Sequence, residues 1–161
     1  MNPHSRETPL GVAQDWLRDR IDDGASCPCC TQHAQVYRWS LYSTAARLLV
    51  KMYRVGGTES FVETRELKGK GQGDASRLRL WGLAEQEKER RPDGGRSGWW
   101  RVTARGEMFI LGRLDIAKYV YVYDGRLLRT DPSKLVSISD VLREPFNWTE
   151  HMNGGSGWDA P

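Results

Sequence analysis

Residues Gly73 to Gly112 decide the fold, and they read GDASRLRLWGLAEQEKERRPDGGRSGWWRVTARGEMFILG. Asp74 is placed to cap a short helix over ASRLRLWG, because its carboxylate can accept hydrogen bonds from the first backbone N–H groups of the helix. Leu83–Glu89 and Trp99–Thr103 then flank a polar, glycine-rich loop, the pattern of a β-hairpin with a long tip. Thr103 is in turn placed to cap a helix over ARGEMFILG. The stretch therefore predicts a helix, a hairpin and a closing helix.

The residues before this stretch predict two more helices and a short strand. The strongest helical pattern begins near Ser43 and is ended by Gly56-Gly57. Its inward residues are Ala45, Leu48, Leu49 and Met52. Phe61 and Val62 indicate a brief strand that leaves Thr64 to cap a helix over RELKG, before the glycine-rich turn GKGQG. The predicted fold is α+β, a winged helix with a helix-turn-helix core and a wing hairpin.

An N-terminal helix and a C-terminal hairpin extend this domain. Thr8-Pro9 starts an amphipathic helix with the periodic apolar residues Val12, Trp16, Leu17 and Ile21. Tyr119–Tyr123 alternates with a period of two, turns at Asp124-Gly125 and returns through Arg126–Thr130, a strong hairpin signal. Ser139 is expected to cap a last short helix. The predicted organisation is an N-terminal helix over residues 1–26, the winged-helix domain over 27–148 and a flexible tail over 149–161.

Positive charge is concentrated on the segment that holds the predicted helix and hairpin. The chain has 24 basic and 21 acidic residues, but residues 36–105 carry 15 basic and 8 acidic ones. Double-stranded DNA is a natural partner for such a segment, although an ordinary solvated surface would look the same. No apolar run is long enough to cross a bilayer, and the first residues do not resemble a signal peptide. We therefore expect a cytoplasmic protein without a membrane partner.

The predicted recognition helix leaves one polar side. With Ala75, Leu78 and Trp81 turned inward, a serine and two arginines point to solvent, and an arginine fork suits guanine edges or phosphates. Lysines in the preceding turn and basic residues around the hairpin tip would contact the flanking backbone. The expected DNA-binding residues are Lys68, Lys70, Ser76, Arg77, Arg79, Lys88, Arg90, Arg91 and Arg96. The acidic residues of the first hairpin strand would repel phosphate unless they face away: Glu85, Glu87 and Glu89.

Cys27, Cys30 and His33 follow one another at intervals of three residues. On a helical or turn-then-helix path they could converge on one zinc ion. A closed tetrahedral site needs a fourth ligand, and the second Cys-x-x-Cys pair of a zinc ribbon is missing from the sequence. The remaining candidates for it are Cys29, His4, His151 or a carboxylate. The alternative is a set of small, partly buried thiols at a helix start, and we expect no bound cofactor, with zinc left open.

Catalytic motifs do not emerge, so a non-enzymatic protein is expected. Cys27-Pro-Cys-Cys30 resembles the Cys-Pro-x-Cys motif of glutaredoxins, but that motif follows a strand in a βαβ unit. A parallel-sheet pattern does not surround it here. The segment GKGQGD at residues 69–74 lacks the lysine and serine or threonine that end a phosphate-binding P-loop.

Four segments resemble a family of small proteins encoded by bacteriophages: CPCCTQHAQVYRWSLYSTAARLL, GDASRLRLWGL, GWWRVTARGEMFILG and AKYVYVYDGRLL. The likeness covers most of residues 27–148, and its most specific part is G-D-x-x-R/K-L-x-x-W-G-L followed by G-x-W-R-x-T-x-x-G. The resemblance implies a phage origin and a layout similar to winged-helix DNA-binding domains. It places Asp74, Arg77, Leu78, Trp81 and Gly82 on the recognition helix, and Trp100, Arg101, Thr103 and Gly106 at the strand-helix junction. The chain departs from the pattern at Cys29, an extra thiol, and at Tyr42, where a better helix cap is expected.

The expected function is a phage-encoded winged-helix DNA-binding protein that acts in transcription or replication control in the host cytoplasm. A homodimer is compatible with this function, with the N-terminal helix or the hairpin Tyr119–Thr130 as its interface. The alternative is a non-enzymatic interaction module that binds a host protein and inhibits or redirects it.

Overall fold

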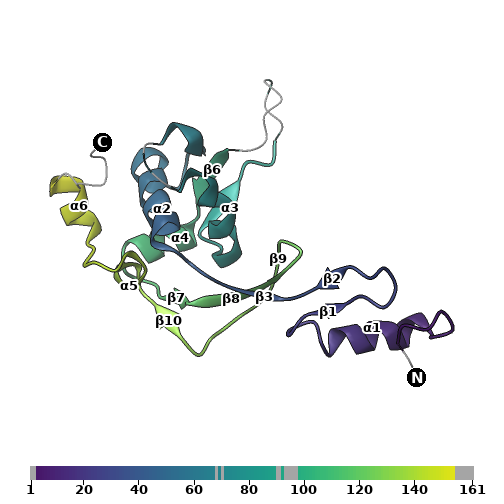
Figure 1. The fold of residues 1–161 in the computed structure, drawn as a ribbon. Coiled ribbons are helices and arrows are strands. Elements are labelled where there is room, and N and C mark those ends of the chain that lie inside the picture. Colours follow the sequence, from purple (N-terminus) through teal and green to yellow (C-terminus); the bar gives the residue numbers. More distant parts are fainter. Residues whose placement is uncertain (1–2, 68, 70, 90–91, 93–97, 155–161) are drawn as a thin grey trace. The chain divides into compact units, whose positions relative to one another are not determined.

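The computed structural model describes residues 3–67, 69, 71–89, 92 and 98–154. Helices and antiparallel strands follow one another along the chain (Figure 1), so the fold is α+β, as the sequence predicts. The backbone forms two compact units: residues 1–39 with 121–129, and residues 40–120 with 130–161. We call them unit 1 and unit 2 and describe each by itself.

Unit 2 is built around α2, which spans Ser43–Gly56. Its inward residues are buried, as the helical spacing predicts: Ala45, Leu48, Leu49 and Met52. The helix packs against α3, α4, α5 and β6 (Figure 1), so its apolar side forms the centre of the core. Gly57 follows with a φ of 58°, a conformation that favours glycine and ends the helix.

A three-stranded antiparallel sheet packs on this core. Its strands are β4 (Val62–Glu63), β5 (Ala84–Gln86) and β6 (Trp99–Val102), in the order β4-β6-β5. Glu85 lies opposite Arg101, and Gln86 lies opposite Trp100. Because neighbouring residues of a strand point to opposite faces, Trp100 and Val102 are buried while Arg101 lies on the other face.

Short helices join the sheet to α2. They are the 3₁₀ helices η1 (Thr64–Glu66), η2 (Gln72–Asp74) and η3 (Arg79–Trp81), and the α-helices α3 (Ala75–Leu78) and α4 (Ala104–Ile110). The Thr103 hydroxyl accepts a hydrogen bond from the Gly106 N–H at 3.1 Å, which confirms the predicted cap of α4.

The caps predicted at Asp74 and Thr64 are wrong. The Asp74 carboxylate accepts a hydrogen bond from the Thr44 hydroxyl, at 2.8 Å, and its side chain does not cap α3. Thr64 is buried and starts the 3₁₀ turn η1 in place of the predicted helix. In both cases the side chain turns to α2 or the core, away from the backbone N–H groups it was expected to cap.

The end of unit 2 begins with an antiparallel pair, β7 (Ile116–Ala117) and β10 (Leu135–Val136), followed by α5 (Ile138–Leu142). The residue that caps α5 is Ser137, not Ser139: its hydroxyl accepts from the Asp140 N–H at 3.2 Å, and the Asp140 carboxylate accepts from the Ser137 N–H at 2.8 Å. This reciprocal pair is a capping box. It is the more stable start because it satisfies two free N–H groups at once.

The last helix, α6 (Trp148–Gly154), begins one residue before the segment predicted as a flexible tail and continues into it. The Asn147 side chain accepts a hydrogen bond from the Glu150 N–H at 3.1 Å, a cap that the prediction overlooked. The Trp148 ring packs on Tyr53 of α2, with 4.8 Å between the ring centroids. These contacts give residues 149–154 a helical structure, and residues 155–161 lie outside the described residues.

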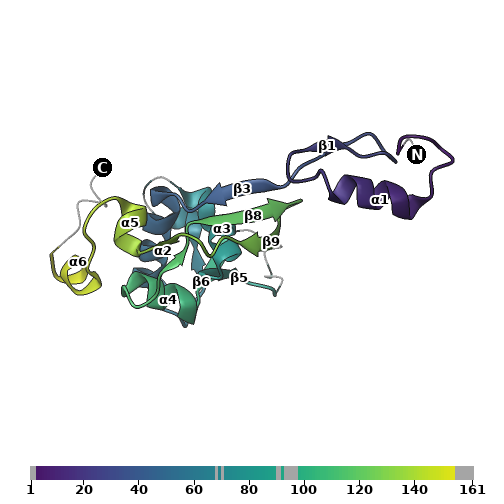
Figure 2. The ribbon, with the colours of Figure 1, turned by 90° about the horizontal axis from the view of Figure 1, so that it is seen from below.

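Unit 1 holds α1 (Leu10–Arg18), the hairpin of β1 (Ala25–Ser26) and β2 (His33–Ala34), and most of β3 (Tyr37–Ser40), β8 (Tyr119–Tyr123) and β9 (Arg126–Thr130). α1 lies beside the β1–β2 hairpin in both views (Figures 1 and 2). β8 is the middle strand of the sheet β3-β8-β9. Asp124 and Gly125 between β8 and β9 have φ angles of 48° and 70°, as a tight hairpin turn requires, which confirms the predicted hairpin. Of the helices in the described ranges, none is long and apolar enough to cross a membrane.

Candidate nucleic-acid interface

A groove of about 750 Å³ lies in unit 2 between the α3–η3 segment and the base of the β5–β6 hairpin. We call it the α3 groove. Its lining residues come from distant parts of the sequence: Thr64, Arg65, Gly73, Ala75, Ser76, Arg79, Gln86, Gly98 and Trp100. Ser76 and Arg79 were both expected to contact DNA. The helix and the hairpin therefore contribute to one hollow.

The α3–η3 segment presents Ser76 and Arg79 because its opposite side is anchored in the core. The predicted inward residues Ala75, Leu78 and Trp81 are all at most 5% exposed. The Trp81 indole N–H also donates to the Ala117 carbonyl at 2.7 Å, which sets the rotation of the helix. The helical spacing of these residues predicted the inward side correctly.

Arg77 points to a different part of unit 2. Its Nε lies 3.9 Å from Asp74 Oδ1, and its guanidinium lies 5.3 Å from the centroid of the Tyr42 ring, just before α2. Arg77 is not among the residues that line the α3 groove. The structure thus separates the two arginines of the predicted recognition helix.

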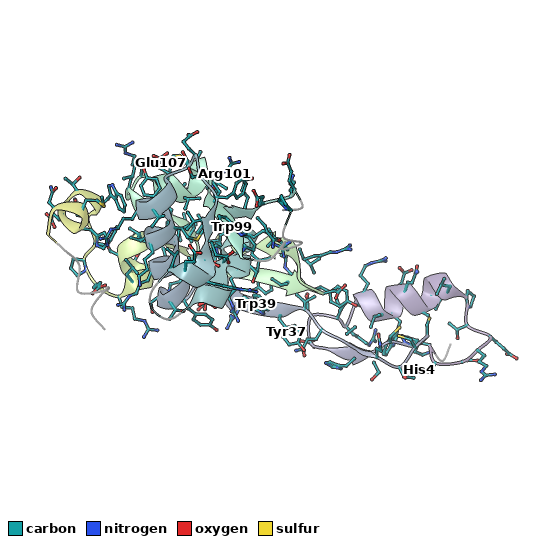
Figure 3. All side chains as sticks on the ribbon, turned by 90° about the horizontal axis from the view of Figure 1, so that it is seen from above. His4, Tyr37, Trp39, Trp99, Arg101 and Glu107 are labelled. Carbon is teal, nitrogen blue, oxygen red and sulfur yellow. The ribbon has the colours of Figure 1, made fainter. Side chains whose placement is uncertain are left out.

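The hairpin strands keep Glu85 away from the groove. Its Oε1 accepts hydrogen bonds from two nitrogens of Arg101 on the opposite strand, Nε at 3.0 Å and Nη2. The Arg101 guanidinium, labelled in Figure 3, also lies 4.6 Å from the centroid of the Phe61 ring. By strand alternation this pair faces away from Gln86 and Trp100, which line the groove. The pairing with Arg101 offsets the charge of Glu85, which does not line the α3 groove but does line the hollow next to it.

Lys88 follows the end of β5 and is exposed. Together with Arg79 it lines an adjoining hollow of about 400 Å³, so the two basic side chains share one surface. Glu85 and Glu87 line this hollow as well, and Glu89 is exposed, so the acidic residues of the hairpin share this surface with the two basic side chains. The other expected contacts lie outside the described residues: Lys68, Lys70, Arg90, Arg91 and Arg96.

Sequence reasoning missed Arg65 and Gln86, which also line the groove. For Gln86 a signal was present, because it is one residue away from Glu85 on a strand and therefore faces the other way. For Arg65 no local pattern existed, since its place depends on the pairing of β4 with β6. Both side chains carry hydrogen-bond donors and line the same groove as Ser76 and Arg79.

Cys27, Cys29 and Cys30 lie in the turn between β1 and β2, not at a helix start. The turn is closed by two backbone hydrogen bonds, from the Cys27 N–H to Gln32 at 2.8 Å and from the Thr31 N–H to Cys27 at 2.9 Å. All three thiols are free. Hydrogen bonds from the backbone N–H groups of Cys30 and then Cys29 hold the pKa of the Cys27 thiol below its ordinary value, whereas desolvation raises the pKa of Cys29.

His33 does not join these thiols. Its ring packs against Gly24, where an added Cβ would lie 2.9 Å from His33 Cε1, and its Nε2 lies 3.3 Å from Gln35 Oε1. Within the described part of the chain, no three His, Cys, Asp or Glu side chains are arranged to hold a metal ion. The arrangement lends no support to a zinc site on Cys27, Cys30 and His33.

Neither a protein-family model, nor a curated protein, nor a solved structure matches this chain. What the protein does must therefore be argued from the α3 groove itself.

Proposed function

We propose that this chain is a winged-helix protein that binds double-stranded DNA through the α3 groove. The order of elements in unit 2 favours this fold: the long helix α2, the strand β4, the helical turn η1, the α3–η3 segment and the β5–β6 hairpin. In a winged helix the strand after the first helix pairs with the returning strand of the wing, and β4 pairs with β6 in this way. The α3–η3 segment would be the recognition helix and the β5–β6 hairpin the wing.

The observation that carries the proposal is the shared position of Arg79, Ser76 and Gln86 in one groove. The Arg79 fork can donate two hydrogen bonds to guanine O6 and N7 or to a phosphate. Ser76 and Gln86 can bond to base edges or sugar-phosphate oxygens on either side of it. Lys88, on the same surface as Arg79, would lie against the flanking backbone.

The biological setting is a proposal as well. The resemblance of residues 27–148 to phage-encoded proteins favours a role in transcription or replication control in an infected cell. A groove that reads base edges suits a regulator that acts by occupying DNA.

Duplex binding of matched arginine variants tests this proposal. A duplex is first selected from a random pool. Arg79→Ala is then expected to weaken binding to it by about 1–3 kcal/mol. It should also lower by about one the slope of log binding constant against log salt concentration, which we call the salt slope. Arg77→Ala removes the same charge from the same helix but lies outside the groove, so it should keep the wild-type slope. Equal losses in the two variants would reject the α3 groove as the interface.

The wild-type protein provides the second readout. We expect retention on duplex DNA at low salt and release as the salt rises. A wild-type protein that enriches no duplex and instead forms a stable complex with a host protein would overturn the DNA-binding proposal in favour of an interaction module.

A further inference from the structure

A second hollow of unit 2, of about 710 Å³, shares no lining residue with the α3 groove. It lies where the loop before α2, the start of β8, β10 and the end of α5 come together. Three of its lining residues are basic: Lys118, Lys134 and Arg143. We call it the basic hollow.

Two of these cations face each other across a strand ladder. β7 and β10 pair with Ala117 opposite Leu135 and Ile116 opposite Val136. The ladder continues by one step, because the Lys118 N–H donates to the Lys134 carbonyl at 2.8 Å. Lys118 and Lys134 are therefore cross-strand neighbours, and like charges in that position repel each other and destabilise the sheet. An anion between them would turn this repulsion into attraction.

The third cation, Arg143, has a strained backbone conformation. Arg143 follows α5 with a φ of 61°, in the left-handed region where a glycine or asparagine is normally found. Its N–H donates to the Asp140 carbonyl at 3.3 Å, which closes the helix. An arginine at this position carries a conformational cost that a glycine would avoid, and strain of this kind gathers at functional sites.

The hollow has one acidic lining residue, Asp140, and it does not neutralise these cations. Its carboxylate accepts hydrogen bonds from the backbone N–H and the hydroxyl of Ser137, at 2.8 and 3.0 Å, and these bonds hold the pKa of Asp140 below its ordinary value. Across the described residues, Lys118, Lys134 and Arg143 form no ion pair with a carboxylate. The lining therefore keeps an excess of positive charge.

The N-terminal end of α2 adds to this positive charge. Ser43, its first residue, lines the hollow together with Tyr42, which stands at the cap position. The Tyr42 side chain makes no capping hydrogen bond, and the first turn contains no acidic residue. The partial positive charge of the helix start thus adds to that of the three cations.

We propose that the basic hollow binds a phosphate group. Three cations that line one hollow match a multiply charged oxyanion better than a single carboxylate, and the volume lies in the range of small-molecule sites. The phosphate can belong to the DNA backbone or to a free phosphorylated molecule, because both present the same oxygens. This inference does not depend on the α3 groove.

Calorimetric titration with sodium tripolyphosphate tests the site. The double variant Lys118→Gln, Lys134→Gln is expected to bind the anion at least about tenfold more weakly than the wild-type protein. A control with the same change of charge is Arg6→Gln, Arg126→Gln, two exposed residues outside the hollow that should leave binding unchanged. No binding by the wild-type protein, or an equal loss in both double variants, would overturn the proposal.

Salt-dependent duplex binding by the same variants identifies the source of the phosphate. A salt slope lowered by about two in Lys118→Gln, Lys134→Gln assigns the hollow to the DNA backbone. An unchanged slope, with the tripolyphosphate affinity lost, assigns it to a free phosphorylated molecule. Arg79→Ala distinguishes the two proposals, since it should weaken duplex binding about tenfold or more and retain tripolyphosphate binding.

Discussion

The α3 groove and the basic hollow both gather positive charge, but they hold it in different ways. In the groove, Arg79 stands on a helical segment whose other side is buried, and the nearby Glu85 is bound by Arg101 on the opposite face. In the hollow, Lys118 and Lys134 face each other across a ladder. The groove therefore holds a few side-chain hydrogen-bond donors in set directions, whereas the hollow brings several positive charges close together.

Because of this difference, we expect the groove to determine specificity for particular bases and the hollow to determine affinity for phosphate. Directed donors such as a planar arginine fork distinguish one base from another, so the groove should depend strongly on how its helix is anchored. Concentrated lysine charge attracts any phosphate and is screened by salt, so the hollow should respond to ionic strength more than to shape.

The largest effect is expected at Trp81. Trp81→Ala removes a buried ring and its hydrogen bond to Ala117, which should lower the free energy of unfolding by about 3–5 kcal/mol in urea denaturation. Trp81→Phe keeps most of the buried surface but leaves the Ala117 carbonyl without its donor, so a loss of about 1–3 kcal/mol is expected.

The same variant tests the contrast between the two sites. Under conditions in which it remains folded, Trp81→Ala should lose duplex binding and keep tripolyphosphate binding. Loss of both together would show that the groove and the hollow are not independent.

A smaller effect is expected at Tyr53, which lines neither site. Its hydroxyl donates to Glu107 Oε1 at 2.6 Å, and this bond, with desolvation, raises the pKa of Tyr53 to about 12. A pKa raised in the folded state means that the stabilisation is complete below the ordinary tyrosine value of about 10 and is lost as the pH rises from there to about 12.

Tyr53→Phe should therefore lower the free energy of unfolding by about 1 kcal/mol at neutral pH and leave both binding affinities unchanged. In an absorbance titration the wild-type protein should show a tyrosine ionising near pH 12 that the variant lacks. Tyr37→Phe, at an exposed position, serves as the control. Equal stability of the Tyr53→Phe and wild-type proteins would contradict this assignment.

The smallest effect is expected at Lys118. Lys118→Gln removes a like-charge neighbour of Lys134, so in phosphate-free, low-salt buffer it should raise the free energy of unfolding by about 0.2–1 kcal/mol. High salt should abolish the gain because it screens the repulsion. Lys118 Nζ also lies 5.2 Å from the centroid of the Tyr119 ring, a favourable contact that the variant loses. A destabilised variant would show that this contact outweighs the repulsion and would remove the like-charge argument.

The sequence predicted those features that depend on neighbouring residues. Helical spacing identified the buried side of α3–η3 and of α2, and Asp124-Gly125 identified the turn between β8 and β9. Thr103 was identified as a cap because the free N–H groups lie within the next turn. The local pattern gave the wrong cap for α5, where two serines were available. Ser137 caps the helix because Asp140, three residues later, completes the capping box, whereas Ser139 has no such acidic residue three positions later.

The features that depend on strand pairing could not be predicted. Arg65 reaches the groove only because β4 pairs with β6, and Lys118 meets Lys134 only through the register of β7 with β10. Arg77 and Arg79 are two residues apart on a short helix, and the contacts of Arg77 with Asp74 and Tyr42 direct its side chain away from the groove that Arg79 lines. These contacts join segments whose relative position only the folded chain determines.

The central claim is that the α3 groove is the surface that binds DNA. Chemical-shift mapping of the backbone amides of the isotope-labelled protein, titrated with a selected duplex, tests it most directly. The account predicts that the largest changes fall on residues 75–79 and 86–88, with any smaller set confined to the basic hollow. Largest changes on α1 or β9, with residues 75–88 unaffected, would contradict it.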